Sequence, residues 1–285
     1  MNFKNIARAC ATAAVAGVLA FALTACGGES APKQIAVPSD ATNEARALLL
    51  LQEEGLITLN EGVGLNATVN DIVDNPYNIE IVEAEAASLP RMLADVDAAV
   101  INGNYAISAD IDPATALASE DSSSEAAAEF GNVIAVRNGE EDSAKTQALL
   151  AALSSQAASD YIGATYSGAV VPTFEVVSEI PQATGDDTTI VVGASPAPHA
   201  EILNQVVDAL AAKGWTLEIV EYTDYVQPNV ALSEGDLDAN YFQHQPYLND
   251  YNAENGTDLV GVAKIHFEPL CMYAGKTTSL DDLAK

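Results

Sequence analysis

Two stretches of the chain indicate its fold, and each runs from a strand into a helix. The first is Ile35-Ala-Val-Pro-Ser-Asp-Ala-Thr-Asn-Glu-Ala-Arg-Ala-Leu-Leu-Leu-Leu-Gln52, and the second is Ile190-Val-Val-Gly-Ala-Ser-Pro-Ala-Pro-His-Ala-Glu-Ile-Leu203. Each contains a short apolar strand, a turn with proline and the start of a helix. The first turn of a helix leaves backbone N–H groups free, so each unit can hold an anion or a polar ligand. Two such units predict two lobes with a ligand cleft.

The rest of the chain alternates between strand and helix patterns. In the first half we predict strands at 79–83, 98–102 and 132–137, and helices at 43–54, at 86–96 and from Ser143 onward. In the second half, strands at 190–194 and 217–220 flank a helix at 200–213. This alternation predicts an α/β fold with a mainly parallel, doubly wound sheet in each lobe. Such sheets bind ligands beyond the carboxyl ends of their strands.

The head of the chain has the pattern of a lipoprotein signal. Lys4 and Arg8 give a positive start, and an uncharged stretch follows up to Ala25. Leu23-Thr-Ala-Cys26 matches the lipobox, in which the cysteine receives lipid and becomes the first mature residue. A plain secretory peptide and a transmembrane anchor are the alternatives, but the apolar run is slightly short for a span of about 20 residues. We predict a signal peptide at 1–25, a diacylated Cys26 and a tether over 26–34.

The chain is strongly acidic, with 41 acidic and 11 basic residues and a formal net charge of -30. Two of the 11 bases and none of the acids lie in the signal, so the mature part is more acidic still. This charge excludes nucleic acid as a partner and disfavours an anionic membrane surface. Of the three cysteines, Cys10 leaves with the signal and Cys26 carries lipid. Cys271 therefore has no partner for an intramolecular disulfide.

Six motifs spread over the mature chain resemble a single family. They are Val191-Val-Gly-Ala-Ser-Pro-Ala-Pro-His199, Tyr222-Thr-Asp-Tyr-Val-Gln-Pro-Asn229, Leu237-Asp-Ala-Asn-Tyr-Phe-Gln-His244, Lys276-Thr-Thr-Ser-Leu-Asp-Asp-Leu283, Asp40-Ala-Thr-Asn-Glu-Ala-Arg46 and Val100-Ile-Asn-Gly-Asn-Tyr105. All six are similar to the methionine-binding lipoproteins of the NlpA/MetQ type, which deliver methionine to an ABC importer. The resemblance covers nearly the whole mature chain. It implies a two-lobed, periplasmic-binding-protein-like (type II) fold and no enzymatic activity.

The order of these motifs departs from that of the family. In the family the Gly-Ala-Ser-Pro-Ala-Pro-His strand opens the mature protein, and Ser-Leu-Asp-Asp-Leu leads directly into the Ile-Ala-Val-Pro strand. Here the second half of the pattern comes first, so the sequence resembles a circular permutation. Residues 175–189 mix Pro, Gly, Thr and acids without periodicity, and we predict that they are the linker joining the family's usual ends.

The permuted order predicts how the chain divides between the lobes. One lobe is expected from 35–135 plus 270–285, and the other from 136–268. The chain should cross between them near Phe267–Met272 and Val133–Arg137. The strand at Ile35 should lie beside the strand that ends at Asn102. Because permutation is tolerated where old and new ends lie in exposed loops, we expect the family's fold to survive.

A free amino acid needs a cation for its carboxylate, acceptors for its ammonium and a slot for its side chain. Arg46, one of three arginines in the mature chain, lies one turn into a helix whose N-terminus favours anions. A guanidinium binds a carboxylate through two hydrogen bonds, so we predict this role for Arg46 rather than a plain surface position. Asn43, one turn earlier on the same face, can donate its amide or cap the helix. Asn102 resembles the family's ligand asparagine, with Asn104 as the alternative.

Aromatic side chains are predicted to form the slot. Tyr225, Phe242 and Phe267 are the candidates, because a thioether gains from aromatic edges. Each could instead pack in the core, and for Phe267 the two interpretations are balanced. His244, two residues after Phe242, is predicted to hydrogen-bond in the pocket.

Neither a metal site nor a catalytic centre is predicted. The three histidines, His199, His244 and His266, include no pair at ligand spacing on one helix, so zinc is disfavoured. The sequence shows no Ser-His-Asp order, no Gly-rich phosphate loop and no activated cysteine, and Cys271 in its apolar run is predicted to be inert core. We therefore predict no catalytic residue and no cofactor.

These observations predict a lipid-anchored, monomeric substrate-binding protein on the extracytoplasmic face of the cell membrane. It would capture L-methionine by a hinge closure between two lobes and deliver it to an ABC permease and its ATPase. The lipid anchor would be its only contact with the membrane. D-methionine or a Gly-Met dipeptide are alternative ligands. A surface adhesive lipoprotein and a permuted sensor scaffold are the alternatives from other classes.

Overall fold

The computed structural model describes residues 31–121, 129–177 and 179–285. One compact unit spans Pro32–Lys285. The predicted signal peptide at 1–25 and the predicted lipidation of Cys26 lie outside the described residues. Of the helices that the structure describes, none has both the length and the apolar character that a membrane span requires.

The first of two large sheets has the strand order β4-β1-β5-β13-β6. These strands are β4 (Glu80–Ala84), β1 (Gln34–Pro38), β5 (Ala98–Ile101), β13 (Cys271–Ala274) and β6 (Ala118–Ser119). Strand β1 runs parallel to β4 and β5, and Ile35 stands opposite Ala98, which confirms the predicted neighbour of the Ile35 strand. Strand β13 is antiparallel to β5 and β6, so the C-terminal part of the chain completes a sheet that the N-terminal part begins.

The helices around this sheet are α1 (Ala41–Glu53), η3 (Ala86–Ser88), α2 (Leu89–Met92), α3 (Gly103–Ser108), η4 (Pro113–Thr115) and α11 (Leu280–Leu283). A short hairpin, β2 (Thr58–Leu59) with β3 (Ile72–Asp74), and two 3-10 turns, η1 (Gly64–Asn66) and η2 (Val69–Asp71), follow α1. Asp40 caps α1 by accepting a hydrogen bond from the Asn43 N–H at 3.1 Å. The single helix predicted over 86–96 is instead η3 followed by α2. Pro90 lies in the first turn of α2, where its missing N–H costs nothing, so a new helix starts there.

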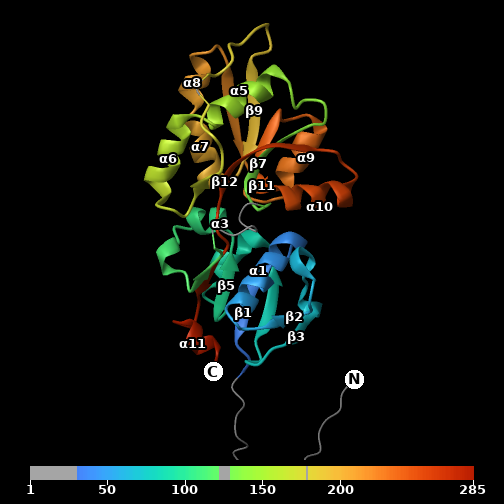
Figure 1. Cartoon of the computed structure of the whole chain (residues 1–285), viewed down its shortest axis with the longest axis vertical. Helices are drawn as coiled ribbons and strands as arrows, with labels where there is room; N and C mark the ends of the chain where they lie inside the picture. The colour runs from blue at the N-terminus through green and yellow to red at the C-terminus, as the bar shows by residue number, and fades with distance from the viewer. Residues whose placement is uncertain (1–30, 122–128, 178) are drawn as a thin grey trace, which may run out of the picture. The chain divides into compact units, whose positions relative to one another are not determined.

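The second sheet has the order β10-β9-β11-β7-β12-β8. Its strands are β10 (Thr216–Glu221), β9 (Thr189–Ala194), β11 (Ala239–His244), β7 (Asn132–Val136), β12 (Val260–Phe267) and β8 (Val171–Pro172). The first three pair in parallel, and the pairings from β11 through β7 and β12 to β8 are antiparallel. The α/β class and the two lobes in Figure 1 agree with the sequence, but both sheets are mixed, so parallel pairing accounts for only part of each.

Two predicted helices of this lobe are interrupted. The helix from Ser143 is α5 (Ala144–Leu153) followed by α6 (Gln156–Tyr166), because Ser155 leaves the helical conformation and caps α6 through the Ala158 N–H. The helix predicted over 200–213 is η5 (Pro196–Ala200), α7 (Glu201–Asn204) and α8 (Val207–Ala211). Helices α9 (Gln227–Glu234) and α10 (Gln245–Asn255) complete the lobe.

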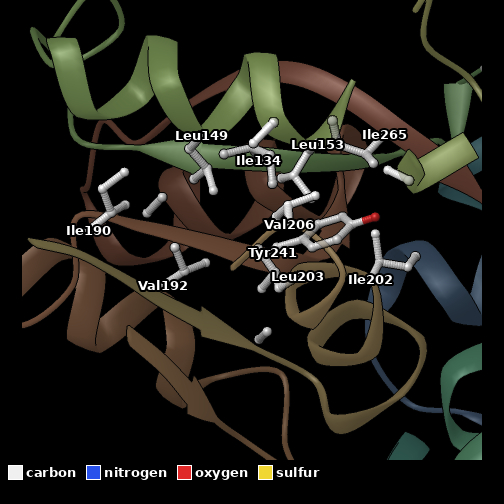
Figure 2. Close-up of a cluster of buried hydrophobic side chains, with 14 of the residues drawn as sticks. Ile134, Leu149, Leu153, Ile190, Val192, Ile202, Leu203, Val206, Tyr241 and Ile265 are labelled. Atoms are coloured by element: carbon white, nitrogen blue, oxygen red, sulfur yellow. The ribbon is translucent and has the colours of Figure 1, made fainter. Parts of the chain in front are cut away.

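Each lobe has its own apolar core. In the second lobe, α5 and α7 pack on one side of the sheet and α9 and α10 on the other, and Figure 2 shows Tyr241 within the cluster under α5 and α7 with its hydroxyl at one edge. The labelled members of that cluster are Ile134, Leu149, Leu153, Ile190, Val192, Ile202, Leu203, Val206, Tyr241 and Ile265. In the first lobe, Ile35, Leu48, Leu51 and Val100 join α1 to the sheet. Burial of such side chains stabilises a fold by about 25 cal/mol per Å² of apolar surface.

The chain passes from one sheet to the other at two places. It returns from β12 to β13 through Glu268, Pro269 and Leu270, which confirms the crossing predicted near Phe267–Met272. The other crossing lies between Ser119 and Asn132 rather than at Val133–Arg137, because Val133–Val136 pair with β11 and β12 inside the second sheet.

We predict that Gly275→Ala destabilises the first lobe. A Cβ there would lie 2.6 Å from the Leu93 carbonyl oxygen and closer still to that of Val96, so backbone would have to move. Overpacking of this kind costs about 1–3 kcal/mol of unfolding free energy, measurable by urea denaturation. Gly163→Ala, on the exposed face of α6 with open space around it, is the matched control and should gain up to about 1 kcal/mol. Equal stability of the two variants would contradict the tight approach at Gly275.

Candidate functional site

A small cavity of about 20 Å³ lies where elements of the two sheets meet. Its wall from the first lobe includes residues of α1, the end of β5 and the start of α3, and its wall from the second includes residues of β7, β11 and α10. The lining residues are Asn43, Arg46, Asn102, Gly103, Asn104, Asn132, Tyr225, Phe242, Gln243, His244, Tyr247, Glu268 and Leu270.

Arg46 is held in the cavity wall by several partners. It is 4 % exposed, and its Nε and Nη2 donate to the two carboxylate oxygens of Glu120 at 3.0 and 2.5 Å. Its guanidinium carbon lies 4.2 Å from the centroid of the Phe130 ring. Within the described residues, Nη1 has one hydrogen-bond partner, Asn43 Oδ1 at 3.3 Å. Nη1 carries two N–H groups, so one remains for a ligand oxygen.

The amide of Asn43 organises its neighbours. Because Asp40 caps the helix, the Asn43 side chain is free to bond elsewhere, and it donates to the Asp40 carboxylate at 2.7 Å. Its Oδ1 accepts from Arg46 and from Asn102 Nδ2, the latter at 2.8 Å. The Asn102 Oδ1 is buried and has no hydrogen-bond partner within the described residues. An unpaired buried acceptor costs about 1–3 kcal/mol, so this oxygen is ready to accept a donor from a ligand.

His244 contributes a neutral imidazole. Burial, and then the charge of Arg46, lower its pKa well below the usual range, so the ring is uncharged at neutral pH. Its Nδ1 accepts from the Tyr247 N–H at 3.1 Å, which leaves the proton on Nε2. That Nε2 lies 3.2 Å from Asn43 Oδ1 and can donate to it. The ring therefore helps to fix Asn43 across the boundary between the lobes.

Aromatic rings line the other side of the cavity. The Tyr225 centroid lies 5.9 Å from that of Phe242 and 5.7 Å from that of Tyr247. The Tyr225 hydroxyl donates to Asn104 Oδ1 at 2.6 Å, and burial raises its pKa well above the usual value, so it stays protonated. These rings present an apolar surface close to the polar group around Arg46.

Six of the seven residues predicted to bind ligand line this cavity: Arg46, Asn43, Asn102, Tyr225, Phe242 and His244. Phe267 does not, because it packs against Phe130 in a small apolar cluster. Asn102 and Asn104 both line the cavity. The choice between them assumed a strand through both, whereas the chain turns into α3 at Gly103, so strand alternation does not apply.

Sequence reasoning missed several lining residues. Tyr247 could have been found, since it stands three residues after His244 at the start of a Pro-containing helix. Glu268 is a lone carboxylate in the apolar run of the β12–β13 crossing, and that placement was a usable signal. Gln243 bonds to Asn229 and Asn240 in a buried amide cluster, and no local pattern predicts that arrangement. Asn132 likewise depends on a distant partner, and so does Glu120, which bonds to Arg46 but does not line the cavity.

Among the described residues, one group of side chains has the composition of a metal site: His199, His266 and Glu268. Their candidate ligand atoms all lie within 4.8 Å of one another. The sequence expectation of no metal site considered only pairs on one helix. This group instead joins η5, β12 and the residue that follows β12.

Comparison with known proteins agrees with the resemblance. TpN32, a membrane lipoprotein of Treponema pallidum, is 44% identical over 138 residues, which are 48% of this chain and 50% of that protein. The D-methionine-binding lipoprotein MetQ of Escherichia coli O157:H7 is 40% identical over 141 residues, 48% of this chain and 51% of that protein. The chain thus spans about half the length of these curated relatives.

A solved lipoprotein structure from Ruminococcus gnavus is 56% identical, with 50% of this chain and 59% of that chain covered and a TM-score of 0.49. The profile of the NlpA lipoprotein family matches residues 30–174 and 190–285 as two segments. Because these segments make up well over half of the sequence, the chain belongs to the NlpA lipoprotein family.

Proposed function

We propose that this chain is a lipid-anchored substrate-binding protein that captures methionine outside the cell and passes it to an ABC permease and its ATPase. The proposal rests on two polar groups in the wall of one cavity. They are the Arg46 N–H that remains for a ligand and the buried Asn102 oxygen, which has no partner among the described residues. A donor for a carboxylate beside an acceptor for an ammonium matches the two ends of a free amino acid. The relative named for binding D-methionine supports the choice of amino acid.

The aromatic wall favours a thioether side chain. Tyr225, Phe242 and Tyr247 offer ring faces and edges, and sulfur gains about 0.3–1.5 kcal/mol from such contacts. Calorimetric titration with L-methionine, D-methionine, Gly-Met and the other amino acids tests the ligand directly. We expect a methionine form to bind best. Equal binding of leucine and methionine would contradict the preference for a thioether that we infer from the aromatic rings. No binding of any amino acid would contradict the proposal itself.

The first prediction concerns the carboxylate. Arg46→Ala should weaken methionine binding by roughly 2–5 kcal/mol, because the ligand carboxylate would be buried without a partner. Arg46→Lys should recover only part of this affinity, since an ammonium cannot donate to both Glu120 oxygens as the guanidinium does and still offer the ligand the N–H of Nη1. Isothermal titration calorimetry measures both effects.

Arg91→Ala is the control, since Arg91 is exposed on α2 and outside the cavity. Arg46 also bonds to Glu120, so circular dichroism must show that each variant is folded. A folded Arg46→Ala protein with parental affinity would show that the carboxylate binds elsewhere.

The second prediction concerns the anchor. If Cys26 is acylated, Cys26→Ala should release the protein into the medium or leave an unprocessed precursor, as immunoblots of membrane and soluble fractions would show. Cys10→Ala is the matched control and should leave processing unchanged, because Cys10 falls within the predicted signal. Normal processing and membrane retention of Cys26→Ala would exclude the lipobox.

We infer that the chain is a circular permutation of the family's usual order. The family profile supports this by matching in two segments that leave out residues 175–189, the predicted linker. Residues near both ends of the described chain also contact Asp97. The Lys33 ammonium lies 3.3 Å from its carboxylate, and the Thr277 N–H donates to its backbone carbonyl at 3.1 Å.

The third prediction follows from that order. A chain rebuilt as 190–285, a short Gly-Ser link and then 33–174 should fold and bind methionine with the same affinity within about threefold, because the cavity contacts are unchanged. When its anchor is placed before residue 190, the rebuilt chain should restore more methionine uptake than the present chain does in cells that lack their own binding protein. Failure of the rebuilt chain to fold would overturn the permutation, and equal uptake would overturn the effect of the moved tether.

A further inference from the structure

A second cluster of chemistry-bearing side chains lies behind the ligand cavity. His199 on η5, His266 on β12 and Glu268 in the β12–β13 crossing are each no more than 6 % exposed. His266 Nε2 lies 2.6 Å from Glu268 Oε1, and His199 Nε2 lies 3.6 Å from the same oxygen. Asn132 on β7 adds an amide oxygen 2.9 Å from His199 Nε2. Four potential ligand atoms therefore converge from four places in the chain.

We propose that His199, His266 and Glu268 bind a zinc ion, with the Asn132 oxygen as the fourth ligand. Zinc stands about 2.0–2.2 Å from nitrogen and oxygen ligands, so the ligand atoms of a tetrahedral site are about 3.3 Å apart. Three of the separations, 2.6, 2.9 and 3.6 Å, lie on both sides of that value, and the candidate atoms of His199, His266 and Glu268 all lie within 4.8 Å of one another. Small side-chain rotations would open the group around an ion.

The ring orientations suit this role. The other nitrogen of His266, Nδ1, is hydrogen-bonded to the Tyr241 hydroxyl, which leaves Nε2 directed at Glu268. Metal-binding histidines are commonly oriented by such a second contact. The His199 ring packs edge-on against Tyr241 and His266, with centroids 4.7 and 4.8 Å away. Figure 2 shows the Tyr241 hydroxyl at the edge of the apolar cluster, so the core itself positions the partner of His266.

The charge balance also favours a cation. His199, His266 and Glu268 are all buried, so the Glu268 carboxylate has lost most of its hydration. Within the described residues, the ion pairs that Glu268 forms are both with histidines. A bound dication would compensate that carboxylate directly.

The donor set selects zinc over the other common cations. Calcium takes six to eight oxygen ligands and magnesium six, whereas this group offers two imidazole nitrogens and two oxygens. Zinc accepts a tetrahedral set of imidazoles and a carboxylate. The ion would also tie the β12–β13 crossing to η5 and β7, because its ligands come from all three.

The site approaches the ligand cavity at Glu268. Gly103 makes this possible, because a Cβ there would stand 2.6 Å from Glu268 Oε2. Glu268 and Asn132 line the cavity, while His199 and His266 lie behind them. The proposal does not depend on the identity of the ligand, so methionine binding and zinc binding can fail separately.

The test uses the full chain, stripped of metal with a chelator and then titrated with Zn²⁺ and with Co²⁺. We expect one Zn²⁺ per chain by calorimetry, the strong visible absorption of tetrahedral Co²⁺, and a higher melting temperature with zinc. His266→Gln and His199→Gln should each lower zinc affinity by roughly tenfold or more and abolish the cobalt spectrum. Both replacements keep hydrogen-bonding side chains, and circular dichroism checks that they fold.

The matched controls are His244→Gln and Glu141→Gln. The first removes a buried histidine outside the cluster, and the second removes a partly exposed acid, which tests for loose binding to the acidic surface. Neither should change the cobalt spectrum. Three results would contradict the proposal: no zinc binding, an equal loss of zinc binding in the controls, or zinc binding that survives both cluster variants. Each would show that the cluster is a hydrogen-bonded network only.

Discussion

The ion pair between the buried Arg46 and the partly buried Glu120 is the contact on which the arrangement of the lobes depends. Glu120 lies at the start of the first crossing between the sheets, and its carboxylate also accepts from the Leu270 N–H of the second crossing at 2.8 Å. Arg46 contacts Glu120 and Phe130, which flank the first crossing, and the Glu268 carbonyl oxygen in the second. One guanidinium thus holds both connections between the lobes.

Removing charged groups such as these from water costs free energy. Desolvation of two charges offsets most of their attraction, but removing one partner leaves the other buried and unpaired at a cost of about 3–5 kcal/mol. The additional bonds to Asn43 and Leu270 satisfy donors and acceptors that the pair alone would leave open. The pair therefore fixes the geometry of the two crossings more than it adds to the free energy of unfolding.

The same pair limits what Arg46 can offer a ligand. Its Nε and Nη2 edge is occupied by Glu120, so in the proposed function a ligand carboxylate would meet the Nη1 side rather than a free fork. The amides of Asn43 and Asn102 and the His244 ring would then share its recognition, which draws on both lobes.

Local patterns predicted the parts of this arrangement that depend on local physics. Short apolar runs placed β1, β5 and β9 within one or two residues, and the helix start placed Arg46 in the cavity wall. Helix lengths were overestimated, because Ser155 and Pro90 interrupt helical periodicity with caps that apolar spacing does not record. Phe267 was misplaced because burial alone cannot separate a core aromatic from a pocket aromatic.

The long-range contacts had no sequence signal. Arg46 meets Glu120 across 74 positions and the Glu268 carbonyl across 222, and such pairings follow only from the sheet order. The order of the motifs matters little to these contacts, because a sheet pairs strands by position in space. Strand β13 inserts between β5 and β6 although more than 150 residues separate it from either, so the first lobe already tolerates a distant strand in its centre. A chain that closes its lobes with crossings near Glu120 and Glu268 can begin and end elsewhere without disturbing the cavity, and that physical independence is what makes a permuted order compatible with binding.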